Sequence, residues 1–349
     1  MGIGNCHKVM DFRQVAKRRL PAPVFHYIDG GADDEWTLRR NTDAFDDYEL
    51  LPAHLSDVSS IEMASTMFGK PVDWPVMISP TGASRLFHAD GEPAVARAAD
   101  KFGMPYSLST VGTTTIEDIG AIGEVPKVFQ IYVFRDRGIT RSFVERCKAS
   151  GYTALCLTVD TPVAGNRERD NYYGMMATAK PALRSVPSML RHPGWLYRAV
   201  IRKDMELVNV KSDLNEQKFT DMSVKDFIDS QFDRSLTWRD VEWLAQEWGG
   251  PLIIKGVQTT HDCRNAADAG ATAVMLSNHG GRQLEGAPAP VDCIADVADA
   301  MGDRLEIICD GGIRRGSHIV KALALGATSV GIGRAYLYAL AAGGQAGVE

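Results

Sequence analysis

Eight short apolar runs that alternate with helical patterns constrain the fold of this chain more than any other feature. The runs cover residues 76–80, 106–110, 128–133, 154–160, 252–257, 273–279, 306–311 and 329–334, and helical patterns cover 92–102, 140–150, 237–248, 259–269, 290–300 and 317–325. Runs that are apolar throughout are typical of parallel strands buried on both faces. Eight such units predict an α/β fold, the (β/α)8 TIM barrel. A doubly wound sheet is disfavoured because no glycine fingerprint follows the first run.

Two segments lie outside this repeat. Residues 1–75 precede the first run and are predicted to form a helical lid, with an amphipathic stretch at 11–19. The interval between the fourth and fifth runs, about 161–251, is far longer than an ordinary βα loop. We therefore expect a single domain over 1–349, in which a lid (1–75) precedes a barrel (76–349) that carries this insertion.

Composition excludes several classes of protein. The net charge of -6 argues against a general affinity for nucleic acid. The six cysteines show neither a CxxC pair nor a metal-ligand spacing, so we expect buried thiols in a reducing compartment and no metal site. The chain has no secretory signal and no run of about 18 apolar residues, which predicts an intracellular protein without a membrane-spanning segment.

Polar side chains follow the predicted strands. His279 and Arg282 come directly after the apolar run 273–276 and are separated by two glycines, a sequence poorly suited to a core. A barrel enzyme presents its base and its cations at such strand ends. Other strand ends supply Pro80, Thr81, Gly82, Ser109, Gln130, Tyr132, Thr158, Asp160 and Lys255, and Arg167 lies a little beyond the fourth run. One of these residues could be a structural charge, but convergence from six strands predicts an active site.

The last two runs are followed by glycines suited to an anion. Asp310, Gly311, Gly312, Ile313 and Arg314 follow the seventh run, and Gly333 and Arg334 follow the eighth. Loops after strands seven and eight of this barrel commonly bind phosphate, through backbone N–H groups and a nearby helix N-terminus. Arginine adds bidentate contacts. These two loops predict a phosphate-bearing ligand.

Several motifs resemble those of a known family. The stretches SNHGGRQLEG, DGGIRRG, ALALGA, TVDTP, FQIYV, LSTVGT and LPAPVFHYIDGGADDE are similar to those of the FMN-dependent α-hydroxy-acid dehydrogenase/oxidase family, over about residue 10 to the end. Within it, RDRG at 135–138 and the segment 333–348 are most similar to the bacterial, quinone-linked L-lactate dehydrogenase type. Chains of this family usually continue with another helix, so the resemblance also implies a sequence that ends early.

The resemblance implies a role for each matching residue. His279 would be the base, and Asp160 would stabilise its charged form. Arg167 and Arg282 would grip the substrate carboxylate, while Tyr27 and Tyr132 would hydrogen-bond its carboxylate or hydroxyl group. Lys255 would lie against the N1/O2 edge of the flavin. The flavin ring and ribityl chain would be lined by Pro80, Thr81, Gly82, Ser109, Gln130, Thr158 and Ser277. The ribityl hydroxyls and phosphate would be held by Asp310, Gly311, Gly312, Ile313, Arg314, Gly333 and Arg334.

The implied activity is FMN-dependent oxidation of an L-2-hydroxy acid, with L-lactate to pyruvate as the expected reaction and a quinone as the expected electron acceptor. Gly82, where oxidases of the family often carry alanine, and Val111 both favour a dehydrogenase. An oxygen-using oxidase and a mandelate-type dehydrogenase remain alternatives, as do hydride and carbanion routes. A barrel isomerase or lyase acting on a phosphorylated substrate would not need Arg167 and Arg282 beside Lys255. The resemblance also implies a homo-oligomer, in particular a tetramer.

Part of the insertion is strongly basic. Residues 176–211 contain seven cations against two acids, a balance of +5: Lys180, Arg184, Arg191, Arg198, Arg202, Lys203 and Lys211 against Asp204 and Glu206. Leu190, Trp195, Leu196, Tyr197, Val200 and Ile201 are interleaved with them. Cations with Trp and aliphatic residues favour a segment that lies on an anionic membrane surface. The alternative is a solvated loop. We therefore expect a cytoplasmic protein bound peripherally to the cytoplasmic face of the inner membrane.

Overall fold

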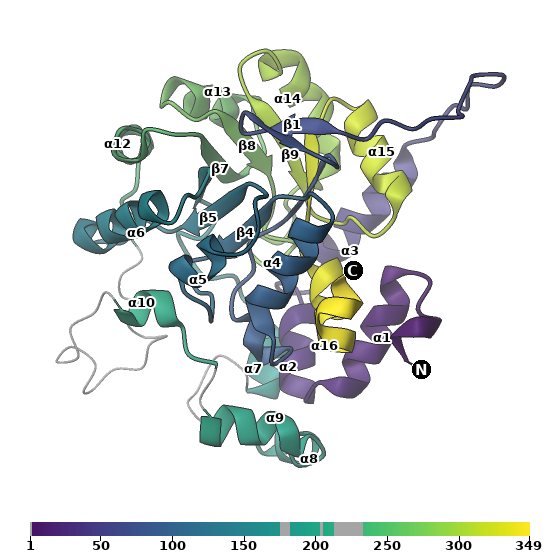
Figure 1. The fold of residues 1–349 in the computed structure, drawn as a ribbon, viewed down its shortest axis with the longest axis vertical. Helices are drawn as coiled ribbons and strands as arrows, with labels where there is room; N and C mark the ends of the chain where they lie inside the picture. The colour runs from purple at the N-terminus through teal and green to yellow at the C-terminus, as the bar shows by residue number, and fades with distance from the viewer. Residues whose placement is uncertain (1, 175–181, 203–204, 213–232) are drawn as a thin grey trace.

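A closed barrel of eight parallel strands forms the centre of the computed structural model, which describes residues 2–174, 182–202, 205–212 and 233–349 (Figure 1). Around the barrel the strand order is β10-β3-β4-β5-β6-β7-β8-β9. The strands are β3 (Val76–Ile78), β4 (Tyr106–Ser109), β5 (Lys127–Ile131), β6 (Ala154–Thr158), β7 (Leu252–Val257), β8 (Ala273–Leu276), β9 (Glu306–Asp310) and β10 (Ser329–Ile332). Each lies within or next to one of the apolar runs, and the predicted TIM barrel is confirmed.

A helix follows each barrel strand, as the alternating pattern predicts. These helices are α4 (Gly91–Lys101), α5 (Ile116–Gly120), α6 (Arg137–Ala149), α12 (Trp238–Trp248), α13 (Thr260–Asp268), α14 (Ile294–Met301), α15 (Gly316–Ala324) and α16 (Arg334–Val348). Side chains cap several N-termini: Thr115 accepts from the backbone N–H of Asp118, and Thr259 accepts from that of Asp262. These caps satisfy backbone donors that have no partner within the helix.

A β-hairpin closes the amino-terminal end of the barrel. Strands β1 (Ser65–Met67) and β2 (Lys70–Val72) pair antiparallel, and Met67 and Phe68 join one apolar cluster with the barrel interior, including Met275 and Ile308. The backbone N–H of Phe68 donates to the carboxylate of Glu306, the first residue of β9, at 3.0 and 3.1 Å. Residues 65–72 therefore do not belong to a helical lid. Three-residue strands are too short to produce a recognisable alternation in the sequence.

Substituting Met67 tests this closure. The side chain is fully buried, so Met67→Ala leaves a cavity among residues that cannot collapse into it. We expect a loss of about 2–5 kcal/mol in the free energy of unfolding, measured by urea titration. Leu51→Ala is a suitable control because Leu51 is 92% exposed. If both substitutions lowered the free energy of unfolding by the same small amount, the result would contradict packing of the hairpin against the barrel interior.

A buried carboxylate joins the N-terminal helices to the rest of the protein. These helices are α1 (Val9–Arg19), α2 (Ala22–Asp29) and α3 (Trp36–Asp43). Asp29 accepts hydrogen bonds from Arg13 at 2.5 and 2.7 Å, from Arg169 at 3.0 Å and from the Tyr338 hydroxyl at 2.8 Å. Burial favours the neutral acid, but these donors and the charge of Arg13 outweigh it and lower the pKa of Asp29 to about 2. Asp29 thus links α1, α2, α16 and the insertion.

The lowered pKa predicts a pH-dependent contribution to stability. Because the folded pKa lies below the ordinary value of 3.8, ionised Asp29 stabilises the fold at pH values above about 4, and this contribution is lost as the pH falls towards 2. We expect Asp29→Asn to lower the free energy of unfolding by about 2 kcal/mol at pH 7. Urea titrations between pH 7 and pH 3 should show the difference from wild type shrinking below about pH 4. A difference independent of pH would contradict this assignment.

The insertion contributes short helices on the outside of the barrel. They are α7 (Glu168–Tyr173), α8 (Val186–Leu190), α9 (Pro193–Tyr197) and α10 (Val208–Ser212), and α8 and α9 lie apart from the barrel at the lower edge of the view (Figure 1). Exposed apolar side chains follow one another along this segment: Leu183 is 90% exposed, Leu190 67%, Tyr197 56%, Val200 61% and Ile201 66%. Lys180, Lys203 and Asp204 of the predicted membrane segment lie outside the described residues.

Trp195 differs from the expectation for a membrane-facing residue. Its side chain is half-buried, and its Nε1–H donates to the backbone carbonyl of Leu86 at 2.8 Å. Trp195 therefore fastens α9 to the loop after β3, because an indole needs a hydrogen-bond acceptor when it leaves water. No helix in the described part of the chain is both long and apolar enough to cross a bilayer.

Candidate active site

A histidine and a carboxylate from two different strands meet at the carboxyl end of the barrel. Nδ1 of His279, just after β8, lies 2.9 Å from Oδ1 of Asp160, just after β6. Because an ionised carboxylate only accepts, Nδ1–H donates, and Nε2 of the neutral ring carries a free lone pair. Burial, the largest influence, would raise the pKa of Asp160, but the charges of His279 and Lys255 and the hydrogen bond from His279 together lower it. A histidine and a carboxylate in this arrangement can accept a proton at Nε2.

The loop that carries His279 has an unusual backbone. His279 adopts a left-handed conformation with φ of 59°, which is uncommon for a non-glycine residue and typical of functional sites. Gly281 follows at φ 73°, and a Cβ atom there would lie 2.5 Å from the backbone nitrogen of Leu38. The side-chain amides of Asn278 and Asn41 bond reciprocally at 2.7 and 2.8 Å. Sequence patterns did not indicate this link between the loop and α3.

Two half-buried arginines share one loosely paired carboxylate. Nη1 of Arg167 lies 3.7 Å and Nη2 of Arg282 lies 3.9 Å from Oδ2 of Asp170, and this oxygen has no hydrogen-bond partner among the described residues. Burial and the charge of Arg167 lower the pKa of Arg282 to about 10. Burial raises the pKa of Asp170, which the two guanidinium groups only partly offset. Because one carboxylate at these distances does not balance two guanidinium groups, this position favours binding of an additional anion.

Arg282 and Arg334 also cap the C-terminal end of α2. Arg282 Nη1 donates to the carbonyls of Tyr27 at 2.6 Å and Gly30 at 2.9 Å. Arg334 donates to Ile28 at 2.9 Å, to Gly30 at 2.8 Å and to Gly280 at 2.8 Å. The last carbonyls of a helix have no partner within it, so these donors fix the lid against the barrel. The resemblance places Arg334 at the phosphate, but three of its N–H groups donate to backbone carbonyls of the protein.

This capping places two tyrosines near the arginines. The guanidinium carbon of Arg282 lies 4.9 Å from the centre of the Tyr27 ring, a cation–π contact. Tyr132, just after β5, is half-buried, and its pKa is raised by burial first and then by the charge of Asp160. Both hydroxyl groups therefore belong to the surroundings of the His279–Asp160 pair.

A buried lysine sits in a network of four strands. Lys255 Nζ of β7 lies 2.9 Å from Ser277 Oγ and 3.3 Å from Asp310 Oδ2. Ser277 and Ser79 also donate to the Asp310 carboxylate, at 2.8 and 2.6 Å. Burial alone would lower the pKa of Lys255, but the charges of Asp310 and Asp160 raise it. The lysine therefore stays charged. The resemblance places Asp310 at the ribityl chain, and in the structure its carboxylate accepts from Ser79 and Ser277 and pairs with Lys255.

Two buried polar atoms, on β5 and β6, have no hydrogen-bond partner among the described residues. Ser109 Oγ donates to Gln130 Oε1 at 2.9 Å, while Gln130 Nε2 and Thr158 Oγ1 have no hydrogen-bond partner within the described structure. Ser109 is opposite Gln130 in the β4–β5 register, and Thr158 is opposite Lys255 in the β6–β7 register. Burying a polar group without a partner costs about 1–3 kcal/mol. These atoms therefore indicate a ligand that hydrogen-bonds along neighbouring strands.

The loops after β3, β9 and β10 lie near the start of α16. A Cβ atom on Gly333, the residue before α16, would meet only Thr81 Cγ2, at 3.9 Å, so the N-terminus of this helix is open to an approaching group. Thr81 Oγ1, next to Pro80, hydrogen-bonds the hydroxyl of Tyr336. Arg314 Nη1 donates to Ile313 O at 2.7 Å, and burial lowers the pKa of Arg314. An open helix N-terminus favours an anion, and the half-buried Arg314 adds a positive charge that also acts on Arg334, the first residue of α16. Gly311 and Gly312 connect Asp310 at the end of β9 to Ile313 and Arg314.

The close approach of Val111 explains glycine at position 82. A Cβ atom there would lie 2.6 Å from Val111 Cγ2. An alanine would therefore displace Val111, and the two residues are coupled.

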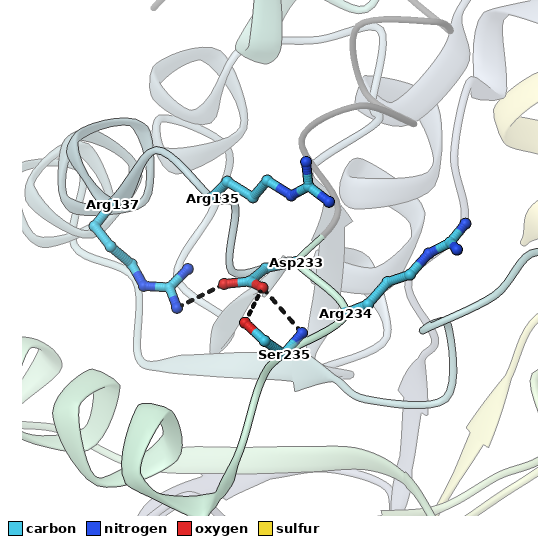
Figure 2. Close-up of a pocket in the computed structure, with 5 residues that line it drawn as sticks. All are labelled: Arg135, Arg137, Asp233, Arg234 and Ser235. Carbon is cyan, nitrogen blue, oxygen red and sulfur yellow. Dashed lines mark hydrogen bonds and ion pairs between the residues drawn. The ribbon is translucent and has the colours of Figure 1, made fainter.

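An open cavity of about 650 Å³ lies apart from these residues, where the insertion returns to the barrel. Figure 2 shows that Arg137 points at Asp233, while Arg135 and Arg234 extend away from it. Arg137 Nη2 lies 2.9 Å from Asp233 and 2.7 Å from Asp240, and Asp233 also accepts from Ser235. Since Arg137 is already paired twice, this cluster ties the end of the insertion to the loop after β5.

Comparison with known proteins shows the family. The model of the family described as FMN-dependent dehydrogenase matches residues 16–349. An L-lactate dehydrogenase of Caulobacter vibrioides is 43% identical over 342 residues, 97% of this chain and 88% of that protein. The crystal structure of the monotopic membrane protein (S)-mandelate dehydrogenase is 37% identical, with a TM-score of 0.91 over 99% of this chain and 91% of the other. A mandelate oxidase variant with (S)-mandelic acid is 31% identical, with a TM-score of 0.83 over 99% and 89%. The chain is an enzyme of the FMN-dependent dehydrogenase family, with FMN as its cofactor.

Proposed function

We propose that this enzyme oxidises L-lactate to pyruvate and passes the electrons to a quinone. The observation that carries the proposal is the His279–Asp160 pair together with the half-buried cations Arg167 and Arg282 at the carboxyl end of the barrel. The name of the 43% identical relative, L-lactate dehydrogenase, supports the choice of substrate.

FMN fits the residues around Lys255. Gln130 Nε2 and Thr158 Oγ1 are buried atoms in need of partners, and the heteroatoms of the flavin ring would supply them. Lys255 offers a buried cation where negative charge develops on the reduced flavin. Thr81, Gly82, Pro80, Ser109 and Ser277 would line the ring and the ribityl chain. Asp310, Gly311, Gly312, Ile313, Arg314, Gly333 and Arg334 would surround the lower ribityl chain and the phosphate.

The substrate carboxylate would bind Arg167 and Arg282. Because their counter-charge Asp170 is held at 3.7 and 3.9 Å, both guanidinium groups retain donors for a planar carboxylate. The hydroxyl groups of Tyr27 and Tyr132 would then orient the carboxylate and the 2-hydroxyl group. This arrangement brings the substrate proton towards Nε2 of His279.

His279 would take that proton at Nε2. Asp160 would stabilise the resulting imidazolium through the 2.9 Å hydrogen bond to Nδ1. When bound, FMN supplies the two-electron oxidation that converts the hydroxy acid into the keto acid.

Visible spectroscopy of the purified protein under anaerobic conditions tests this function. L-lactate should bleach the yellow flavin at once, and a soluble quinone analogue should restore the colour faster than air does. (S)-Mandelate, tested in parallel, separates the mandelate-type alternative. A flavin that bleaches with (S)-mandelate alone would overturn the proposed substrate, and faster reoxidation by air would overturn the proposed acceptor.

We also propose that the insertion binds the enzyme peripherally to the cytoplasmic face of the inner membrane. The exposed apolar side chains between Leu183 and Ile201, together with the neighbouring cations, support this proposal, as does the likeness to a monotopic membrane protein. The tetramer implied by the resemblance stays a prediction.

Deleting residues 176–202 should move the enzyme into the soluble fraction on ultracentrifugation. This deletion keeps Asn209, whose side chain accepts from the backbone N–H of Ile116 at 3.0 Å and donates to Thr114 O at 2.9 Å. Unchanged flavin absorbance would verify that the shortened protein is folded. Sedimentation with membranes despite the deletion would contradict the proposal.

A further inference from the structure

A second cavity, of about 400 Å³, lies between the lid helices α1 and α2 and the insertion helix α8. Lys17 and Arg18 reach it from α1, and Arg191 reaches it from the end of α8. Leu20 and Phe25 supply apolar lining. This volume is in the range of small-ligand sites.

The charges of this cavity all have one sign. No carboxylate lines it, and Lys17, Arg18 and Arg191 form no ion pair with any described residue. Like charges held close together favour binding of an anion, which removes their mutual repulsion. Guanidinium groups suit phosphate oxygens in particular, because they bond them in a bidentate manner.

Hydrogen bonds hold the two walls of the cavity together. Ser188 Oγ of α8 accepts from the backbone N–H of Ala22 at 2.8 Å. His192 contacts Ser188 O through Nδ1 at 2.7 Å and Arg18 O through Nε2 at 3.2 Å. The segments that carry Arg18 and Arg191 are therefore joined before any ligand arrives, which lowers the ordering cost of binding.

The cavity adjoins the exposed apolar surface of the insertion. Arg191 directly follows Leu190, which is 67% exposed, and Tyr197, Val200 and Ile201 are exposed on the next turns of the chain. A ligand with both a phosphate and hydrocarbon tails would place its phosphate among the cations and its tails along these side chains. A free phosphate ion would make no use of the apolar residues.

We propose that this cavity binds the phosphodiester headgroup of an anionic phospholipid. The site is separate from the His279–Asp160 centre, and the inference rests on the membrane association proposed above. The headgroup would bridge Arg18 of the lid and Arg191 of the insertion, so that lipid binding joins the two segments.

A pair of matched double variants of the full-length FMN-loaded enzyme tests the site. Arg18→Gln with Arg191→Gln removes one cation from each wall, and Arg19→Gln with Arg202→Gln removes one from α1 and one from the insertion outside the cavity. Two probes are used: vesicles of phosphatidylcholine with or without phosphatidylglycerol, and monomeric short-chain phosphatidylglycerol, titrated by calorimetry. Flavin absorbance and turnover with a soluble acceptor should be the same in all proteins.

We expect the cavity variant to bind the short-chain lipid about tenfold or more weakly than wild type, and the control variant to bind it nearly as wild type does. Equal losses of lipid affinity in both variants would mean that diffuse surface charge binds the lipid, and would overturn the site. The same conclusion would follow if the wild type bound phosphatidylglycerol vesicles but not the monomeric lipid. Inorganic phosphate that displaces the lipid at equal concentration would overturn the headgroup assignment. Failure of wild type to bind any vesicle would instead overturn the membrane association itself.

Discussion

Replacing His279 by asparagine is expected to lower kcat for L-lactate by about 10²–10⁴-fold, the usual contribution of a positioned general base. Asparagine tolerates the left-handed backbone that His279 adopts at φ 59°, so the loop should keep its shape. Its amide can still donate to Asp160 but cannot take a proton. Stopped-flow reduction of the flavin by L-lactate would measure the loss directly.

Two controls separate chemistry from binding. FMN affinity and the oxidised flavin spectrum should be unchanged, since the His279 side chain bonds Asp160, while only its backbone N–H, which asparagine keeps, bonds Ser277. Asp160→Asn should also slow reduction, and the double variant should be little slower than His279→Asn alone, because residues that act as a unit are not additive. A His279→Asn enzyme within about tenfold of wild type would show that another group takes the proton.

Replacing Lys255 by methionine is expected to lower the free energy of unfolding by about 3–5 kcal/mol, because it leaves the carboxylate of Asp310 without its cation. Lys255 is 4% exposed and Asp310 is 8% exposed, so water cannot compensate. The same change should weaken FMN binding, which fluorescence titration of the cofactor-free protein would measure.

A double variant distinguishes the ion pair from simple loss of packing. Lys255→Met combined with Asp310→Asn removes both charges and should recover much of the lost stability, since the amide oxygen can accept from one of the hydroxyls of Ser79 and Ser277 while the amide NH2 donates to the other. FMN affinity should not recover, because it depends on the cation itself. Stability losses that simply add would argue against coupling between Lys255 and Asp310.

The parts of the fold that depend on local pattern could be predicted from the sequence. Each barrel strand overlaps one of the apolar runs, and Gly103, Gly151, Gly270 and Gly326, which follow α4, α6, α13 and α15, all adopt positive φ, at 61°, 71°, 94° and 109°. The strand-end rule placed His279 and Asp160 at the same end of the barrel, and the family resemblance implied their pairing, although 119 positions separate them in the chain. Periodicity and barrel geometry suffice for such features.

Features that arise from contacts between distant segments were missed. Asp170 belongs to the charged run 166–170, whose composition is typical of a solvated loop. Its neighbours in the sequence do not indicate that its carboxylate lies between Arg167 and Arg282. The capping of α2 by Arg334 joins residues 304 and 306 positions apart. Trp195 was assigned to the membrane from its neighbours, whereas its partner Leu86 lies 109 positions away. In each case the partner that determines the position of the side chain comes close only in the folded structure.

The β1–β2 hairpin has a consequence for synthesis of the chain on the ribosome. The hairpin emerges before any barrel strand, yet Glu306, which receives the backbone N–H of Phe68, is 238 residues further on. At about 5–20 residues per second, the apolar side chains of Met67 and Phe68 wait on the order of 10–50 seconds for their partners. The nascent chain therefore carries an exposed apolar hairpin until the last strands are made, and chaperones that bind extended apolar segments would find their target there.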